Sequence, residues 1–123
     1  MQYVRSDLGP QPRGHYSQAV TANGFVFVAG QLPLFVGDDA VPKGIEAQTR
    51  QALRNVSHVL EAAGSGLDKL VSVTVYVTDI ADWPIVNRIY AEMLGDHRPA
   101  RTVAVSPQLH FGCLVEIQAI AMA

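Results

Sequence analysis

The residues best suited to chemistry begin with Arg101, which lies within the segment from His97 to Val105. From Ala100 onward this segment predicts a strand in which Arg101, Val103 and Val105 point to one side. A guanidinium between apolar neighbours needs a partner, and the usual partner is a carboxylate or a phosphate bound by two hydrogen bonds. The chain must therefore supply an internal acid for Arg101 or hold it for a ligand.

A pair of polar residues near the C-terminus offers one answer. The segment from Cys113 to Ala121 alternates as a strand does, and it places Glu116 and Gln118 side by side on the face opposite Ile117. Glu116 is the best internal candidate to pair with Arg101.

Familiar catalytic motifs are absent from the sequence, which lacks G-x-S-x-G, a P-loop, H-E-x-x-H and G-x-G-x-x-G. None of the four histidines has the spacing of a metal ligand. A nucleophile pair of Cys113 and His110 is conceivable, but a buried structural thiol is the preferred interpretation. The remaining anion-binding and hydrogen-bonding groups suit a small carboxylate ligand and a positioned water; they are Arg101, Tyr16, the Gly30 backbone, Asn87 and Gln118.

Composition narrows the classes of protein that fit. The 123 residues predict a single domain spanning 1–123, with a net charge of −2 and no basic run, which argues against nucleic acid and against an anionic membrane surface. One cysteine and an N-terminus without an apolar region favour the cytoplasm. Only 16% of residues are charged while 49% are hydrophobic, so we expect apolar surface to be buried between subunits of a homo-oligomer.

Periodicity predicts the elements that must position these groups. Asn23-Gly24 predicts a hairpin turn into a central strand, Phe25–Ala29, which is apolar on both sides and is expected to be covered on both. Helices are predicted for 44–63 and from Asp79 or Asp82 to Gly95, with strands at 70–77, 100–105 and 113–121. Two helices on one face of a mixed sheet make a two-layer α+β domain.

Two of the predicted site residues can also be explained without a ligand. Gly30 either allows something to approach its backbone closely or ends the strand at a bulge. Asn87 lies on the inner stripe of the second helix, where we favour an amide that satisfies backbone groups in the core over one that contacts ligand. The adjacent Asp38 and Asp39 predict a solvated turn and no metal site.

Six blocks of sequence, in register from Gly14 to Ala121, resemble the RidA/YjgF family of enamine/imine deaminases. The blocks are Y-S-Q-A-V at 16–20, A-G-Q-L-P at 29–33, E-A-Q-T-R at 46–50, V-N-R-I-Y at 86–90, P-A-R-T at 99–102 and V-E-I-Q-A-I-A at 115–121. The resemblance implies a chorismate-mutase-like fold with a mixed six-stranded sheet and two helices on one face. It also implies a homotrimer that binds small carboxylate ligands in clefts between subunits, with no cofactor and no metal.

The resemblance also implies roles for single residues. Arg101 would bind the carboxylate of a 2-imino acid, and the backbones of Gly30 and Val103 would contact the ligand. Tyr16 would line the cleft. The position of Gln118 usually holds a glutamate that handles the hydrolytic water. The reaction would remove a reactive intermediate and release a 2-keto acid and ammonia.

Departures from the family pattern leave alternatives open. Gln118 can hold a water molecule but cannot take its proton. The chain could therefore be a deaminase of a different substrate, such as an aminomuconate-like enamine, or a non-catalytic trimer that binds a 2-keto acid. A ribonuclease or translation inhibitor, a third function attached to the family, is disfavoured by the acidic pI of about 6.0.

Overall fold

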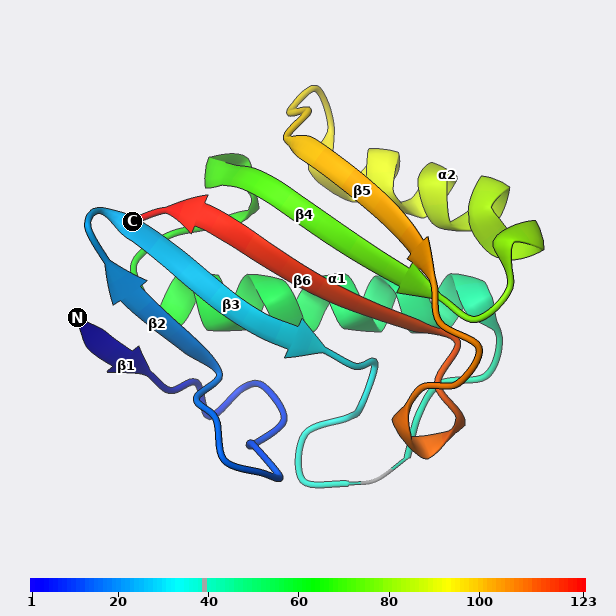
Figure 1. The fold of residues 1–123 in the computed structure, drawn as a ribbon, viewed down its shortest axis with the longest axis horizontal. Coiled ribbons are helices and arrows are strands. Elements are labelled where there is room, and N and C mark those ends of the chain that lie inside the picture. The colour runs from blue at the N-terminus through cyan, green and yellow to red at the C-terminus, as the bar shows by residue number, and fades with distance from the viewer. Residues whose placement is uncertain (39) are drawn as a thin grey trace.

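Six strands form one mixed sheet, and two helices cover one of its faces (Figure 1). The computed structural model describes residues 1–38 and 40–123. The strands are β1 (Gln2–Val4), β2 (Ala19–Ala22), β3 (Phe25–Gln31), β4 (Leu70–Val77), β5 (Ala100–Val105) and β6 (Val115–Met122). The helices are α1 (Ile45–Ala62) and α2 (Trp83–Leu94), with single 3₁₀ turns η1 (Leu67–Lys69), η2 (Ile80–Asp82) and η3 (His110–Gly112). The predicted two-layer α+β fold is confirmed.

The order of strands across the sheet is β1-β2-β3-β6-β4-β5. Neighbouring strands are antiparallel except β4 and β5, which are parallel and joined through α2. The predicted hairpin forms: Asn23 (φ 52°) and Gly24 (φ 83°) occupy its turn, in the region of positive φ that these two residue types tolerate.

The core lies between the sheet and the helices. Leu53, Val56 and Leu60 of α1 are fully buried, and so is Val75 of β4. The predicted strand 70–77 has the bounds of β4. Its alternation predicts that Val71 shares a core-facing side with Val73, Val75 and Val77, and for Val71 this prediction is wrong. A register shift between Leu70 and Ser72 turns the Val71 side chain outward, where it is 40% exposed.

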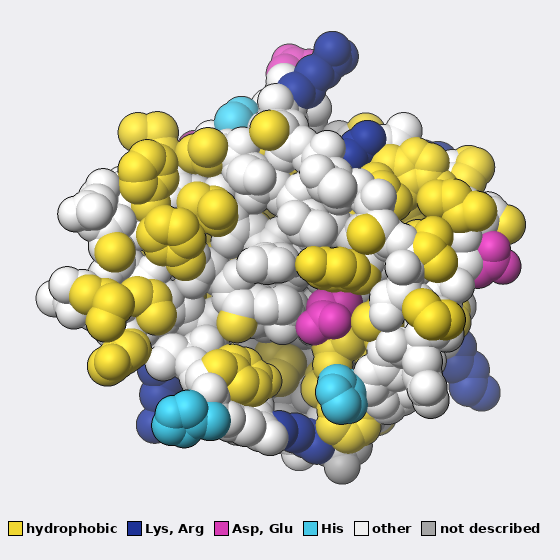
Figure 2. Space-filling view, in the orientation of Figure 1, with side chains coloured by type: hydrophobic (Ala, Val, Ile, Leu, Met, Phe, Trp, Pro, Cys, Tyr) yellow, Lys and Arg dark blue, Asp and Glu magenta, His cyan; other side chains and the backbone are white. Residues whose placement is uncertain are grey.

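The opposite face of the sheet is open, and hydrophobic side chains gather over parts of it (Figure 2). β3 is central, as predicted, but the expectation that it is covered on both faces is wrong for the single chain. Phe25 and Phe27 are 38% and 44% exposed and lie on the open side, where they oppose Met122 and Ile120 of β6. This open face carries the apolar surface that the low charge content led us to expect.

Arg101 lies on β5, which is the edge strand next to β4. In the parallel ladder Arg101 is opposite Val73 and Val103 is opposite Val75. Because Val73 and Val75 point into the core beneath the helices, Arg101 points toward the helical layer. Its position at the edge keeps it exposed to solvent.

Candidate functional site

The Arg101 guanidinium is held by three side chains of α2. Its Nη1 donates a hydrogen bond to Asn87 Oδ1 at 3.0 Å. Its Cζ lies 4.6 Å from the centroid of the Trp83 ring and 4.9 Å from that of Tyr90. These distances are in the range of cation–π contacts, which favour a cation over the face of an aromatic ring. We call this arrangement of Arg101, Asn87, Trp83 and Tyr90 the Arg101 clamp.

The spacing along α2 explains how the clamp forms. Positions 83, 87 and 90 are separated by four and three residues, so they share one face of the helix. The expectation that Asn87 satisfies backbone groups in the core is wrong, because its side chain is exposed and its amide oxygen accepts from Arg101. Asn87 lies at the border of the buried face of α2, where its side chain contacts Arg101 of the edge strand β5.

The predicted pairing of Arg101 with Glu116 is also wrong. Glu116 is opposite Tyr76 in the β4–β6 ladder, on the open face of the sheet, whereas Arg101 points toward the helices. Within residues 1–38 and 40–123 no carboxylate pairs with Arg101. Its remaining donors are available to an external anion.

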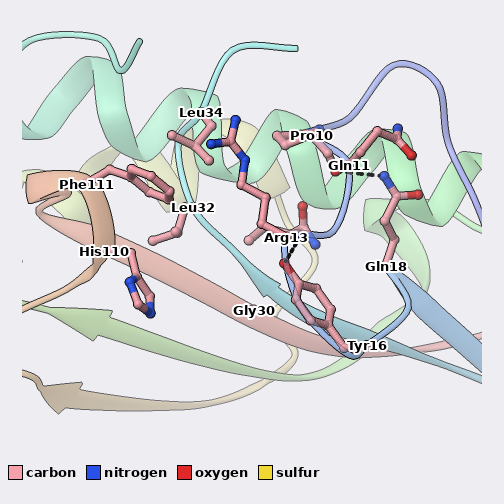
Figure 3. A pocket seen from close by; sticks show the side chains of 11 residues that line it. Pro10, Gln11, Arg13, Tyr16, Gln18, Gly30, Leu32, Leu34, His110 and Phe111 are labelled. Carbon is pink, nitrogen blue, oxygen red and sulfur yellow. Dashed lines mark hydrogen bonds between the residues drawn. The ribbon is translucent and has the colours of Figure 1, made fainter. Parts of the chain in front are cut away.

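A second group of predicted residues surrounds a different cavity, shown in Figure 3. Tyr16 and Gly30 line this hollow of about 200 Å³ together with His110 and Phe111. Tyr16 comes from the loop before β2, Gly30 from the end of β3, and the last two from η3. We call this hollow the Tyr16 cavity.

The Tyr16 cavity has a cation at its wall that the sequence interpretation did not single out. The Arg13 guanidinium carbon lies 5.1 Å from the centroid of the Phe111 ring. The Arg13 backbone N–H donates to Tyr16 Oη at 3.5 Å. No motif marks Arg13, because its contact with Phe111 depends on how η3 packs against the loop before β2.

The reason for a glycine at position 30 is visible on the open face. A Cβ atom at this position would lie 2.5 Å from Glu116 Oε2 and 3.1 Å from its Cδ. A register shift between Val28 and Gln31 also interrupts the β3–β6 ladder here. Both predicted explanations for Gly30 therefore hold: there is a bulge, and the group that approaches closely is the Glu116 side chain.

The other two predicted residues are placed as follows. Val103 is half-buried on β5 and packs against the core, while its main chain belongs to the edge strand. Gln118 is exposed on the open face, opposite Thr74 of β4 and two residues from Glu116. The predicted placement of Glu116 and Gln118 on one face is confirmed.

One chain thus gathers the predicted residues into two separate groups. Arg101 and Asn87 line a hollow of about 440 Å³ beside α2, while Tyr16 and Gly30 line the Tyr16 cavity. Gln118 lies on the open sheet face. The Arg101 clamp lies on the edge strand β5 and the Tyr16 cavity lies beside β2 and β3, so strands β6 and β4 separate an anion on the clamp from the Tyr16 cavity of the same chain.

A row of amides on α1 supports the loops around the Tyr16 cavity. Asn55 is fully buried, and its Nδ2 donates to the carbonyl oxygens of Leu32 and Leu34 at 2.9 and 3.0 Å. Gln48 Oε1 accepts from the Leu114 N–H at 2.8 Å, which fixes the chain between η3 and β6. The sequence interpretation missed these residues, although positions 48, 51 and 55 share one helical face and are all amides.

Burial alters the acidity of three groups near these cavities. It raises the pKa of the Tyr90 phenol, which the Arg101 charge lowers in turn. It raises the pKa of the Cys113 thiol, and the Glu116 charge adds to that rise. Burial also raises the pKa of the Glu116 carboxyl, against which the His110 charge acts. Cys113 is buried, in agreement with the structural thiol that we preferred.

We searched the described part of the chain for groups that could bind a metal ion and for helices that could span a membrane. Across 1–38 and 40–123, no group of three or more His, Cys, Asp or Glu side chains is placed to hold a metal ion. Among these same residues no helix has the length and apolarity to cross a membrane.

Comparisons with known proteins agree on one family. The family model described as Endoribonuclease L-PSP matches residues 7–123. A RutC family protein of Pyrococcus horikoshii is 42% identical over 119 residues, which cover 96% of this chain and 94% of that protein. RidA from an Antarctic Psychrobacter species has a TM-score of 0.96 at 32% identity, with all of both chains covered. E. coli TdcF with bound serine has a TM-score of 0.95 at 28% identity, covering 100% of this chain and 99% of that one.

These matches extend over nearly the whole chain in sequence and in structure, and they agree with the six blocks that carry the resemblance. The chain belongs to the RidA/YjgF/RutC family.

Proposed function

We propose that this protein is a hydrolytic deaminase of a small 2-imino or enamine carboxylate, which it converts to a 2-keto acid and ammonia. The observation that carries the proposal is the Arg101 clamp. Its guanidinium is exposed, is oriented by Asn87 and two aromatic rings, and has no carboxylate partner within the described residues. Such a group suits recognition of a substrate carboxylate by two parallel hydrogen bonds.

The chemistry requires little beyond positioning. A protonated imine is already an electrophile, so water can attack its carbon once substrate and water are held together. In this proposal Arg101 binds the carboxylate, the backbones of Gly30 and Val103 contact the ligand, Tyr16 and Asn87 shape the site, and Gln118 orients the water. Neither a cofactor nor a metal takes part.

A homotrimer would complete the site. The Arg101 clamp and the Tyr16 cavity lie on different sides of one chain, so a substrate that contacts both must lie between two copies. The exposed Phe25, Phe27 and Met122 of the open face supply apolar surface for such contacts. We propose that the ligand binds at these subunit interfaces, and that the reaction takes place in the cytoplasm.

The names of the relatives point to two kinds of ligand. TdcF with bound serine is a relative that holds a small amino acid, which agrees with a carboxylate site. The description of the family model as an endoribonuclease suggests RNA instead. The net charge of −2 offers little attraction for a polyanion, so we favour the small carboxylate.

The test measures ammonia release from 2-iminobutanoate and 2-aminoacrylate, which a threonine/serine dehydratase generates in the same cuvette. We expect the protein to accelerate release above the spontaneous rate and the Arg101→Ala variant to lose this acceleration while its oligomeric state persists. Arg5→Ala, which removes an arginine from an exposed surface pair with Asp7, is the matched control and should retain full activity. Undiminished turnover by Arg101→Ala would exclude the clamp from the mechanism.

Gln118 favours a second candidate, a non-catalytic trimer that binds a 2-keto acid at the same place, because an amide cannot accept a proton near neutral pH. If this candidate is correct, the wild-type protein accelerates nothing, although it binds 2-ketobutyrate, and Gln118→Glu creates activity. If an aminomuconate-like enamine is the substrate instead, the wild-type protein is active on that compound alone.

A further inference from the structure

Phe111 has a backbone conformation that does not suit its side chain. Its φ of 60° and ψ of 23° lie in the left-handed region, where the Cβ of a bulky residue is crowded. Gly112 follows with a φ of 67°, so η3 contains two consecutive residues of positive φ. The hairpin turn at Asn23 and Gly24 also has two, at 52° and 83°, but with residue types that tolerate them. A strained phenylalanine therefore stands where an asparagine would be less strained.

Burial in the core does not explain why this strain is kept. The Phe111 side chain is 48% exposed and lies outside the hydrophobic core. Its ring centroid lies 5.1 Å from the Arg13 guanidinium carbon and 6.1 Å from the centroid of the His110 ring. Strained residues of this kind cluster at active sites and ligand clamps. The surface that the ring forms is therefore a candidate for function.

The Phe111 ring forms a wall that two hollows share. It lines the Tyr16 cavity of about 200 Å³, which it faces from η3, on the side away from Tyr16 (Figure 3). It also lines a second hollow, of about 580 Å³, beside Glu116. Among the described residues, Phe111 and His110 are the two that line both hollows, so they divide one from the other.

We propose that Phe111 is a specificity-determining residue that restricts the substrate to a short side chain. The inference rests on the proposed deaminase function and deepens it by naming the class of imine. In that function the Arg101 clamp of one copy holds the carboxylate, and the ligand contacts Tyr16 and the Gly30 backbone of a neighbouring copy. The part of the substrate that the clamp does not hold therefore enters the Tyr16 cavity.

The size of the Tyr16 cavity sets the class of side chain. A short aliphatic chain, as in 2-iminobutanoate, fits within about 200 Å³. An aromatic or long branched chain would meet the Phe111 ring. The ring cannot easily turn away, because the backbone conformation limits the rotamers that a side chain can adopt. If the ring were removed, the cavity would open into the larger hollow beside Glu116.

The test compares ammonia release from 2-iminobutanoate and from 2-imino-3-phenylpropanoate, each generated in the cuvette by an L-amino-acid oxidase with catalase. We expect the wild-type protein to favour the smaller imine in kcat/KM. Phe111→Ala opens the wall, so the ratio of the two kcat/KM values should fall by about 10- to 100-fold, within the range in which pockets discriminate small apolar groups. Phe111→Tyr retains the ring and should retain the wild-type ratio.

Phe35→Ala is the matched control, because it truncates a phenylalanine of similar exposure. Phe35 is 41% exposed, compared with 48% for Phe111, and it lies in the loop after β3. It does not line the Tyr16 cavity or the hollow beside Glu116. We expect this variant to keep the wild-type ratio of kcat/KM values.

Thermal unfolding tests the strain independently of activity. Glycine is ordinarily less stable than alanine at a given position, but at positive φ the order reverses because glycine has no Cβ to crowd. We therefore expect the Tm of Phe111→Gly to lie a few degrees above that of Phe111→Ala. At Phe35, whose φ is not positive, the glycine variant should unfold below the alanine variant. Both variants of Phe111 open the wall, so they should show the same substrate ratio.

The outcomes separate this inference from the proposed function. If the wild-type protein accelerates the hydrolysis of neither imine, the proposed function fails and this inference fails with it. If the wild-type protein is active and the ratio is unchanged in Phe111→Ala and Phe111→Gly, the deaminase stands and Phe111 does not determine specificity. A wild-type preference for the aromatic imine would also overturn the inference. So would an equal fall of the ratio in Phe35→Ala, or a Phe111→Gly variant that is less stable than Phe111→Ala.

Discussion

Replacing Gly30 by alanine displaces the Glu116 side chain, which lies on the same face as Gln118, with little expected effect on the stability of the fold. The new Cβ would lie 2.5 Å from Glu116 Oε2, so the carboxylate must retreat by about 0.9 Å to reach the 3.4 Å at which ordinary contact begins. It has room to do so, because the hollow of about 580 Å³ lies beside it. The colliding atom is the end of a flexible side chain, so the backbone need not move.

The two consequences of this substitution differ in size. A shift of the side chain away from its preferred rotamer costs about 0.5–1.5 kcal/mol. Replacing glycine also lowers the conformational entropy of the unfolded chain, which stabilises the fold by about 0.4–1 kcal/mol. The two effects nearly cancel, so Tm should change by only a few degrees. A misplacement of about 1 Å can cost about 10²-fold in rate, so we expect kcat to fall by about 10- to 100-fold.

Thermal unfolding and steady-state ammonia release measure the two effects on the same sample. Gly9→Ala is the control, because a Cβ there meets nothing closer than 3.7 Å. Added to Glu116→Gln, the Gly30→Ala substitution should lower kcat no further, since both act through one carboxylate. A Gly30→Ala variant with wild-type kcat would refute the reasoning, as would one whose Tm falls by more than the few degrees expected.

Three further predictions concern the groups around the site. Asn87→Ala removes the acceptor that orients Arg101, and because that hydrogen bond is exposed we expect KM for the imine to rise by only about 3- to 10-fold, measured with Arg5→Ala as control. Asn55→Ala leaves the carbonyl groups of residues 32 and 34 buried without donors, and urea unfolding should show a loss of about 2–4 kcal/mol. Folding raises the pKa of Glu116, so between its ordinary pKa and its raised pKa the folded chain binds more protons than the unfolded chain. The free energy of unfolding should therefore fall as pH rises through that interval. Glu116→Gln should remove this dependence in urea unfolding at a series of pH values and be at least as stable at neutral pH; a dependence equal to wild type would contradict it.

Periodicity predicted the elements well, because each element buries one face. The apolar stripe on α1 and the alternation along β4 placed both elements within one or two residues. The exception, Val71, follows from a register shift, and no pattern within a single strand reveals how that strand pairs with its neighbour.

The same limit explains the error about Arg101 and Glu116. Alternation assigns each residue to one of two faces of its own strand, but it does not say which face of one strand continues which face of another. That depends on the register between β4, β5 and β6, which placed the two residues on opposite sides of the sheet. Asn87 was misjudged for a related reason, because its helical stripe borders the edge strand.

The separation of the Arg101 clamp from Glu116 has a consequence for mixtures of variants. If the site is shared between neighbouring copies of a cyclic trimer, Arg101→Ala chains still contribute an intact Glu116, and Glu116→Gln chains still contribute an intact clamp. We expect each variant alone to have little activity. Each mixed trimer, however, contains one interface at which both intact halves meet. Because about three quarters of the trimers are mixed when equal amounts combine at random, co-refolding the two variants should restore up to about one quarter of the activity by intersubunit complementation.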